Sequence, residues 1–427
     1  MSVSFSHIKE GTSSTKDLTK CTDKIESNCG IPPDKHFVGQ IYANLTKSIY
    51  QVVFSPNSGQ FAVCGDPKEV RLFSMSDCLA DATGDEEEMD SISSQADLAR
   101  RKTKTSFPWV GFGSAENTSR VVAVDWSKDG RWIATASNCG NWSVYKADTL
   151  ELHRKGKWPD SGEMKGISFS ADSRRVVVTG ASGKIGTVDF INPSSTIQLY
   201  TRHPSTSYAA YLSPCGKLLL SCSWQKQVRI NLDTSSYVSL PGHTTNVWDC
   251  DWHPSDPDQF LSVSSGTHIL HWTIIDRQAL FERARGPDTA RTLSETEVNS
   301  GSLIKRVKAT QPNAGTGSYY GIQFSPNGKY YVACGQSGAC RIFDAQTDSL
   351  CWALSVHSSS VWRSVWSPNG KYLASCSMDN TVVIWRAPFY FTKLNTLKLL
   401  CLDVIEKNPT HHSKELKEMY PEYFFFE

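Results

Sequence analysis

The stretch Ser360–Trp385 reads SVWRSVWSPNGKYLASCSMDNTVVIW. Its first run ends in an aromatic residue, Trp366, and a Ser-Pro-Asn-Gly turn follows directly. A strand of small residues, a second polar turn and a β-branched run that ends at Trp385 come next. Short apolar runs separated by turn residues are typical of β-strands joined by tight turns. The stretch therefore predicts one unit of an all-β fold.

The same pattern recurs along the chain at a regular spacing. Its anchor is an aromatic residue or leucine followed by Ser or His and a polar turn, and it occurs at Phe54, Trp126, Phe169, Leu212, Trp252, Phe324 and Trp366. Successive anchors are 72, 43, 43, 40, 72 and 42 residues apart. A period of about 40 residues is that of a four-stranded propeller blade, and each of the two long intervals adds roughly thirty residues. We therefore expect an all-β, seven-bladed propeller, whose closure leaves few open sheet edges.

The repeat resembles that of the WD-repeat family. One Gly-His pair, Gly242 and His243, is present, and no repeat closes on Trp-Asp. The ring is expected to span 36–388, with residues 36–44 supplying the outer strand of the seventh blade and so removing an open edge. We expect a flexible tail over 1–35, surface loops over about 76–106 and 277–317, and a helical module over 389–427. The first loop contains an acidic cluster next to Ser91–Ser94, which is either a modifiable docking loop or a solvated loop.

Composition excludes several classes of function. The chain has 427 residues, with 44 Lys and Arg against 43 Asp and Glu and a formal net charge of +1 at pH 7. This balance excludes a broad electrostatic attraction to nucleic acid or to anionic membranes. No run reaches the roughly 20 apolar residues of a spanning helix, and Met1–Glu10 lacks the apolar core of a signal peptide. The 13 cysteines show no zinc spacing, so we expect free thiols, no metal site, and a soluble protein of the cytoplasm, the nucleus or both.

Four polar residues of blade seven invite a catalytic interpretation. They are His357, Ser375, Asp379 and Trp385. The resemblance to WD-repeat blades implies that these positions instead form a structural hydrogen-bonded tetrad, which satisfies buried polar groups. A hydrolase also needs an oxyanion site, and no Gly-x-Ser-x-Gly nucleophile elbow occurs. We therefore expect no catalytic residue, no cofactor and no enzyme activity.

One position of the blades is unusually rich in aromatic residues. The residues five before and two before each anchor are mostly apolar, although an interval of three places them on opposite faces of a regular strand. A β-bulge between them is therefore predicted, and it would turn the residue four before the anchor toward the channel mouth. That residue is Tyr or Trp in blades four, five, six, seven and one, at Tyr208, Trp248, Tyr320, Trp362 and Tyr50.

These five residues are candidates for a partner-binding arc. Blade seven adjoins blade one, so the five positions are contiguous around the ring. Rigid amphipathic rings are favoured at binding hot spots, although they could equally fill the neck of the channel. Arg363, with Lys165, stands beside the arc and would suit an acidic or phosphorylated ligand.

The segment after the ring contains a second candidate site. Asn395 or Thr396 can cap a helix that ends before Pro409. Its apolar residues share one face and must be buried against something; they are Leu397, Leu400, Cys401 and Ile405. The spacing from Thr396 to Ile405 matches the BC box, the Elongin-C-binding helix of SOCS-box proteins.

The whole chain thus resembles the WD-repeat and SOCS-box protein family. The resemblance implies a substrate-recognition adaptor of a cullin-RING ubiquitin ligase, which binds a target protein on the propeller and Elongin B/C through the BC box. The Leu-Pro-x-Pro run of the family is not evident here, so recruitment of a cullin is left open. The alternative is a general WD-repeat interaction scaffold whose tail helix packs on the propeller and has no ubiquitin role.

Overall fold

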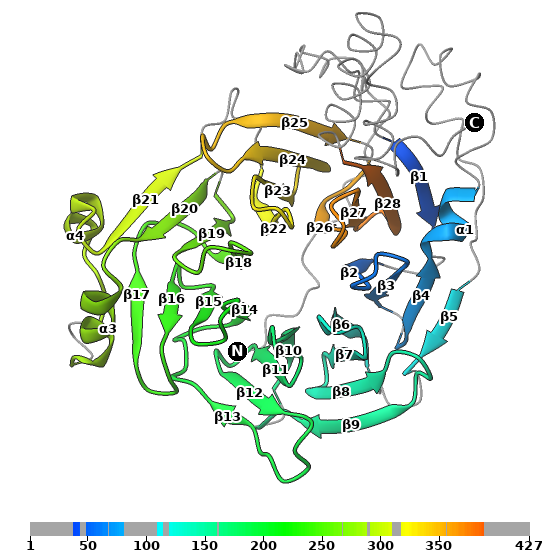
Figure 1. Ribbon diagram of the computed structural model, residues 1–427, viewed down its shortest axis with the longest axis horizontal. Coiled ribbons are helices and arrows are strands. Elements are labelled where there is room, and N and C mark those ends of the chain that lie inside the picture. Colours follow the sequence, from blue (N-terminus) through cyan, green and yellow to red (C-terminus); the bar gives the residue numbers. More distant parts are fainter. Residues whose placement is uncertain are drawn as a thin grey trace, which may run out of the picture.

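Seven four-stranded antiparallel sheets stand around one axis in the computed structural model (Figure 1). The structure describes residues 37–42, 48–66, 68–80, 109–113, 119–159, 162–266, 268–287, 291–309, 317–355 and 357–387. The predicted seven-bladed propeller is therefore confirmed. The predicted tail over 1–35, the acidic cluster of the first insertion and the SOCS-box-like module over 389–427 lie outside these residues.

Each of the first six blades runs outward along the chain from an inner strand that ends in an anchor. Blade one consists of β2 (Ile49–Phe54), β3 (Gln60–Gly65), β4 (Val70–Ser74) and β5 (Trp109–Phe112). Blade two consists of β6 (Val121–Trp126), β7 (Trp132–Ser137), β8 (Asn141–Lys146) and β9 (Leu152–Lys157). Blade three consists of β10 (Met164–Phe169), β11 (Arg175–Gly180), β12 (Ile185–Asp189) and β13 (Gln198–Leu199).

The remaining blades follow the same plan. Blade four consists of β14 (Ser207–Leu212), β15 (Leu219–Ser223), β16 (Val228–Asn231) and β17 (Tyr237–Leu240). Blade five consists of β18 (Val247–Trp252), β19 (Gln259–Ser264), β20 (Ile269–Ile274) and β21 (Ile304–Lys308). Blade six consists of β22 (Tyr319–Phe324), β23 (Tyr330–Gly335), β24 (Ala339–Asp344) and β25 (Leu350–Ser355). Blade seven consists of β26 (Val361–Trp366), β27 (Tyr372–Ser377), β28 (Thr381–Arg386) and β1 (Phe37–Tyr42).

Blade seven is completed by the strand that comes first in the sequence. β1 pairs antiparallel with β28, with Tyr42 opposite Thr381. The predicted closure of blade seven by the first strand is therefore confirmed for residues 37–42. The pairing covers the outer edge of β28 and joins the first and last strands of the ring in one sheet.

Every inner strand carries the predicted bulge. The pairing register shifts at the residue four before each anchor, for example between Val247 and Asp249 in blade five and between Val361 and Arg363 in blade seven. The same shift occurs in the other five blades. A bulge lets apolar residues three positions apart face the same core, as Val247 and Cys250 do.

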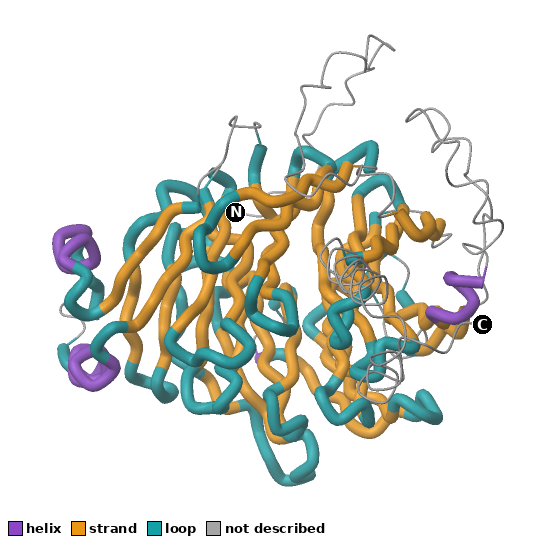
Figure 2. The backbone as a smooth tube through the Cα atoms, turned by 45° about the horizontal axis from the view of Figure 1, so that its top comes forward, coloured by secondary structure: helices purple, strands orange, loops and turns teal. Residues whose placement is uncertain are grey.

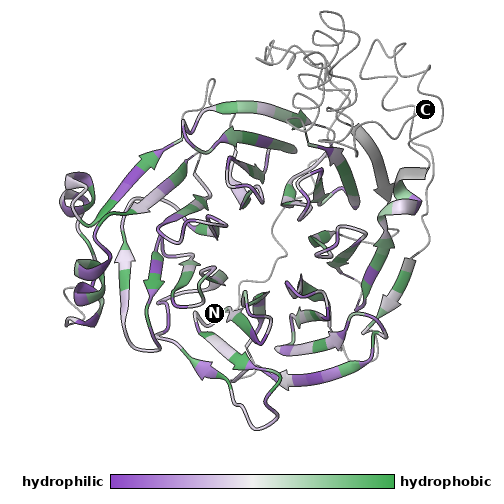
Figure 3. Ribbon diagram, viewed as in Figure 1, coloured by the Kyte–Doolittle hydropathy of each residue, from purple (hydrophilic) through white to green (hydrophobic). Residues whose placement is uncertain are grey.

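The second strand of most blades contributes an almost continuously buried run to the core. Five residues in a row are buried in β7, β11, β19, β23 and β27. Neighbouring strands stack their aromatic rings, as Phe61 does on Phe73 at 5.1 Å between centroids and Tyr331 on Phe343 at the same distance. The outer strand β9 has the sequence LHRKGK, alternates in exposure and is largely hydrophilic (Figure 3).

Side chains next to the anchors join neighbouring blades. The Asp125 carboxylate accepts a hydrogen bond from the Phe169 amide at 2.7 Å, which links blades two and three. The Asp251 carboxylate accepts from the Phe324 amide at 2.8 Å, which links blades five and six. Burial raises the pKa of Asp251 to about 7. These bonds connect inner strands that make no backbone pairing with each other.

The second insertion corrects the prediction of a surface loop over 277–317. It contains α3 (Arg277–Arg285), α4 (Glu295–Ser300) and the outer strand β21, and the helices lie on the rim of the ring (Figure 2). Residues between the helices add to the free edge of blade four, since Ser239 N donates to Arg291 O and Leu293 N to Ser239 O. Between β20 and β21 the described residues include few buried apolar side chains, which hides the helical period; they are Leu280, Ala284, Leu293 and Val298.

The part of the first insertion that the structure describes is also helical. α1 (Met75–Ala80) follows β4, and Met75 and Cys78 are buried in the core of blades one and seven. Within the described ranges, no helix is long and apolar enough to span a bilayer.

Candidate functional site

Five aromatic side chains stand side by side at the bulges of neighbouring blades. The ring centroids of Tyr208 and Trp248 lie 4.6 Å apart, and those of Trp248 and Tyr320 lie 5.3 Å apart. Trp362 continues the series, at 4.9 Å from Tyr320 and 6.3 Å from Tyr50. Each of these spacings is a ring contact. The five rings form one continuous surface, which we call the aromatic arc.

Hydrogen bonds at the polar tips orient two rings of the arc. Trp248 Nε1 donates to Ser265 Oγ at 2.6 Å, and the Tyr50 hydroxyl donates to the Asp66 carboxylate at 2.9 Å. All five rings are half-buried, so each presents part of its surface to solvent. Rings that are already fixed lose little conformational entropy when a partner binds. Trp248 and Tyr50 thus combine an oriented ring with the amphipathic chemistry that binding hot spots favour.

Two further exposed apolar side chains lie at the same end of the ring as the arc. Trp224 is 37% exposed and packs on Tyr208 at 5.4 Å and on Trp248 at 5.9 Å. Met378 is 40% exposed. The Trp224 amide donates to Thr206 O and the Met378 amide to Ser360 O, each just before an inner strand, so both lie at the end of the ring where the bulges are. Counting back from the anchors does not reveal either residue, because both lie in turns rather than at the bulge position.

The bulges of blades two and three carry different chemistry. Val122 and Lys165 occupy the position that is aromatic in the other blades. Lys165 forms an ion pair with Glu163 at 2.8 Å. Arg120 donates to the Tyr50 hydroxyl at 3.1 Å and lies 3.6 Å from the Asp66 carboxylate. The mouth of the ring thus has an aromatic half and a charged half.

Arg363 does not take the place that the sequence predicted for it beside the arc. Its Nη1 donates to Asp249 Oδ2, and its Nη2 donates to the Tyr211 hydroxyl at 2.6 Å. Only 16% of the Arg363 side chain and 1% of the Asp249 side chain are exposed. Alternation resumes after the bulge at Trp362 and turns Arg363 away from solvent. Arg363 is therefore a buried partner of Asp249 and not a ligand-facing member of the arc.

The four polar residues of blade seven lie together as a connected network. His357 Nε2 lies 2.8 Å from Ser375 Oγ, which also accepts from Trp385 Nε1 at 2.9 Å. His357 Nδ1 lies 3.1 Å from Asp379 Oδ2. Desolvation opposes ionisation of Asp379, but hydrogen bonds and the charge interaction with His357 outweigh it and lower the pKa of this carboxyl to about 2. Ser375 is fully buried and already engaged on both sides, so its hydroxyl is not presented to a substrate.

Blades four and five contain related networks that sequence analysis did not single out. His203 Nε2 lies 2.9 Å from Ser221 Oγ, to which Asn231 Nδ2 also donates. His243 Nε2 lies 2.7 Å from Ser262 Oγ, to which Trp272 Nε1 donates at 2.9 Å. Burial lowers the pKa of His243 to about 3 and that of His203 well below its usual value, and the nearby guanidinium groups of Arg306 and Arg229 add to these shifts. In the sequence, these networks are marked by a Ser-x-Ser pair on the second strand of blades four, five and seven.

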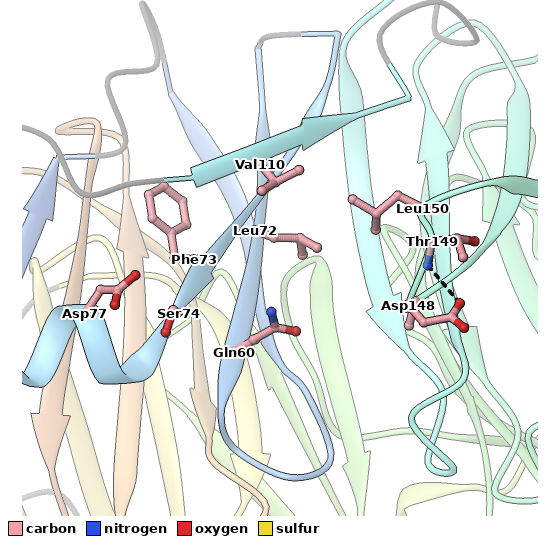
Figure 4. A pocket seen from close by; sticks show the side chains of 10 residues that line it. Gln60, Leu72, Phe73, Ser74, Asp77, Val110, Asp148, Thr149 and Leu150 are labelled. Carbon is pink, nitrogen blue, oxygen red and sulfur yellow. Dashed lines mark hydrogen bonds between the residues drawn. The ribbon is translucent and has the colours of Figure 1, made fainter.

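A shallow cleft lies between blades one and two (Figure 4). Leu72, Val110 and Leu150 line it, with the carboxylates of Asp77 and Asp148 at its margins. The Asp148 carboxylate accepts from the Thr149 amide at 2.8 Å. In the portion of the chain that the structure describes, no three His, Cys, Asp or Glu side chains are grouped to hold a metal ion.

Similarity to known proteins agrees with the geometry of the blades. The family profile of the WD domain, G-beta repeat, matches residues 112–146, 234–273, 309–344 and 349–386. The chain contains WD repeats. A guanine nucleotide-binding protein subunit beta from Zea mays is 22% identical over 248 residues, which cover 54% of this chain and 57% of that protein. The last matched repeat ends at residue 386.

Proposed function

We propose that this WD-repeat propeller is a protein-binding scaffold whose docking surface is the aromatic arc. The observation that carries the proposal is the contact between aromatic rings at one repeated bulge position in five successive blades. The fold does not require a ring there, since Val122 and Lys165 occupy the same position in blades two and three.

Apolar contact, rather than net charge, drives the proposed binding. Buried Trp and Tyr side chains dominate the energetics of protein interfaces. The ion pairs of the charged half leave little excess charge at the mouth, because Lys165 pairs with Glu163 and Arg120 lies beside Asp66. A partner segment with apolar side chains therefore fits the arc better than a strongly acidic or basic one.

A matched pair of double variants tests this proposal. Peptides are selected on the wild-type protein from a phage-displayed library of short random sequences, and their Kd is measured by fluorescence anisotropy. Trp248→Ala with Trp362→Ala should weaken binding by about 100-fold, at about 1.4 kcal/mol for each ring. Val122→Ala with Lys165→Ala, at the same bulge position, should change Kd less than about threefold. Equal binding by all three proteins would remove the arc as the docking surface.

We infer a finer role from the segment beyond the propeller: the protein is a substrate receptor that recruits Elongin B/C and, through it, a cullin-RING ubiquitin ligase. Support comes from the BC-box spacing of Thr396, Leu397, Leu400, Cys401 and Ile405, all of which lie outside the described residues. Leu397 and Cys401 are spaced as an i, i+4 pair that can enter a partner's groove from one helix face. The alternative is a scaffold whose tail helix packs on the propeller.

A pull-down with purified Elongin B/C separates these two roles. The wild-type protein should retain Elongin B/C, and Leu397→Pro or Cys401→Phe should abolish retention. Lys398→Ala changes a residue that the motif leaves free and should bind as the wild type does. Absence of wild-type binding would exclude the Elongin-recruiting role and leave only the scaffold role.

A further inference from the structure

A buried ion pair connects blades that are not neighbours in the ring. Arg363 on β26 of blade seven reaches past blade six to Asp249 on β18 of blade five. The same guanidinium donates to the Tyr211 hydroxyl on β14 of blade four at 2.6 Å. The Tyr211 hydroxyl donates in turn to Asp249 Oδ1 at 3.2 Å, so the three side chains form a closed triangle. Blade six joins through the Ile322 amide, which donates to Asp249 Oδ2 at 3.0 Å.

The chemistry of this triangle requires an arginine. A guanidinium presents several donors in one plane and can bond a carboxylate and a hydroxyl together, whereas a lysine ammonium is a compact point charge. Asp249 is almost fully enclosed, so its charge depends on Arg363 for compensation. We call Arg363, Asp249 and Tyr211 the cross-blade bridge.

Two members of the bridge are the chain neighbours of two members of the arc. Arg363 directly follows Trp362, and Asp249 directly follows Trp248, so each bridged residue comes straight after a bulge. The rings of Trp362 and Trp248 lie 6.2 Å apart, and Tyr320 of the intervening blade contacts both. The bridge therefore joins the two inner strands directly after the bulges that hold these tryptophans.

We propose that Arg363 is a positioning residue of the arc, which holds Trp248 and Trp362 at the separation that a partner recognises. This inference rests on the proposed docking function of the arc. A pre-organised surface binds more tightly than one that must order its side chains on contact. Loss of the bridge should therefore weaken binding without removing any atom of the docking surface.

Fluorine NMR of protein labelled with fluorotryptophan reads the position of the rings without a partner. Trp→Phe variants assign the signals of Trp248, Trp362 and Trp158, the last buried in the core of blades two and three. The double variant Arg363→Gln with Asp249→Asn removes both charges together, so that neither is left buried alone. It should shift or broaden the signals of Trp248 and Trp362 and leave that of Trp158 unchanged.

Binding of the phage-selected peptides completes the test. The double variant should weaken Kd by about 10-fold, and Arg363→Lys, which keeps the charge opposite Asp249, should recover part of that loss. Unmoved tryptophan signals and an unchanged Kd in the double variant would overturn the positioning role. That result, together with weak binding by Trp248→Ala with Trp362→Ala, would leave the docking function standing. Full binding by the alanine variant would instead remove the docking function itself.

Discussion

Blades four, five and seven share one backbone plan with blades two and three but differ from them at two repeated positions. At the inner-strand bulge, the first group carries Tyr208, Trp248 and Trp362, whereas the second carries Val122 and Lys165. On the second strand, the first group carries a serine that bonds a buried histidine, at Ser221, Ser262 and Ser375. Blades two and three carry Thr135 and Val178 at that place.

The comparison separates what the fold requires from what it permits. Both groups of blades form four-stranded sheets with the same bulge in the inner strand. Neither the aromatic ring nor the histidine network is therefore needed to form a blade. Each of the three blades with a histidine network also contributes a ring to the arc. Blades six and one contribute a ring without such a network, since Ala333 and Val63 take the place of the serine, so the two features are separate.

The largest expected effect comes from breaking a histidine network. Ser375→Ala removes the one oxygen that His357 Nε2 and Trp385 Nε1 share. Two buried ring nitrogens then lose a partner, and the free energy of unfolding should fall by about 3 kcal/mol. Urea denaturation measures it. A double-mutant cycle with Trp385→Phe should show that the two changes together cost less than their sum. A change below about 0.5 kcal/mol would show that the network adds little to blade seven.

A smaller, pH-dependent effect should distinguish the buried histidine of blade five. The pKa of His243 is about 3 in the folded protein, well below the usual value of 6.5, so folding favours the neutral ring. The unfolded chain then binds a proton that the folded protein does not, and this stability is present above pH 6.5 and is lost as the pH falls toward 3.

The comparison of wild type with His243→Gln isolates this contribution. The stability difference between the two proteins should change by about 2 kcal/mol in favour of the variant between about pH 7.5 and about pH 5. The difference between wild type and Val122→Ala, which has no titrating group, should stay constant. A pH-independent difference for His243→Gln would contradict the assignment of a neutral buried ring.

The smallest effect is expected in the charged half. Lys165→Ala removes a single ion pair with Glu163, a carboxylate that is half exposed. Such pairs contribute little, and the free energy of unfolding should change by about 0.5 kcal/mol or less. Thermal denaturation in buffers of low and high salt measures it. A fall in the free energy of unfolding close to that of Ser375→Ala would contradict this expectation. It would show that the charged half contributes as much to stability as the blades of the aromatic half.

The repeated features of this molecule could be predicted from the sequence, because each copy supports the others. Seven anchors gave the blade number, and counting back from them located the bulges and the arc. Counting back from the anchors does not find Trp224, because this residue lies in a turn. Its ring nevertheless contacts two members of the arc, Tyr208 and Trp248. Features that occur once, such as this turn, have no second copy to reveal them.

The partner of Arg363 and the helices of the second insertion could not be predicted from the sequence, for different reasons. The partner of Arg363 is 114 residues away in the chain, in a blade that is not adjacent, so no local pattern predicts it. The sequence does not predict α3, because a helix that buries only Leu280 and Ala284 has too few apolar positions to show a helical period. A Ser-x-x-Glu capping box at Ser294 and Glu297 was the available signal for α4.

Site-specific photo-crosslinking tests the docking role of the arc most directly. Benzoylphenylalanine replaces Tyr320 at the centre of the arc in one protein and Lys165, at the equivalent bulge of the charged half, in another. Both proteins are irradiated with a labelled phage-selected peptide, and the adducts are mapped by mass spectrometry. The account predicts a strong adduct at position 320 and none above background at position 165. Equal adducts at the two positions, or an adduct at position 165 alone, would contradict it.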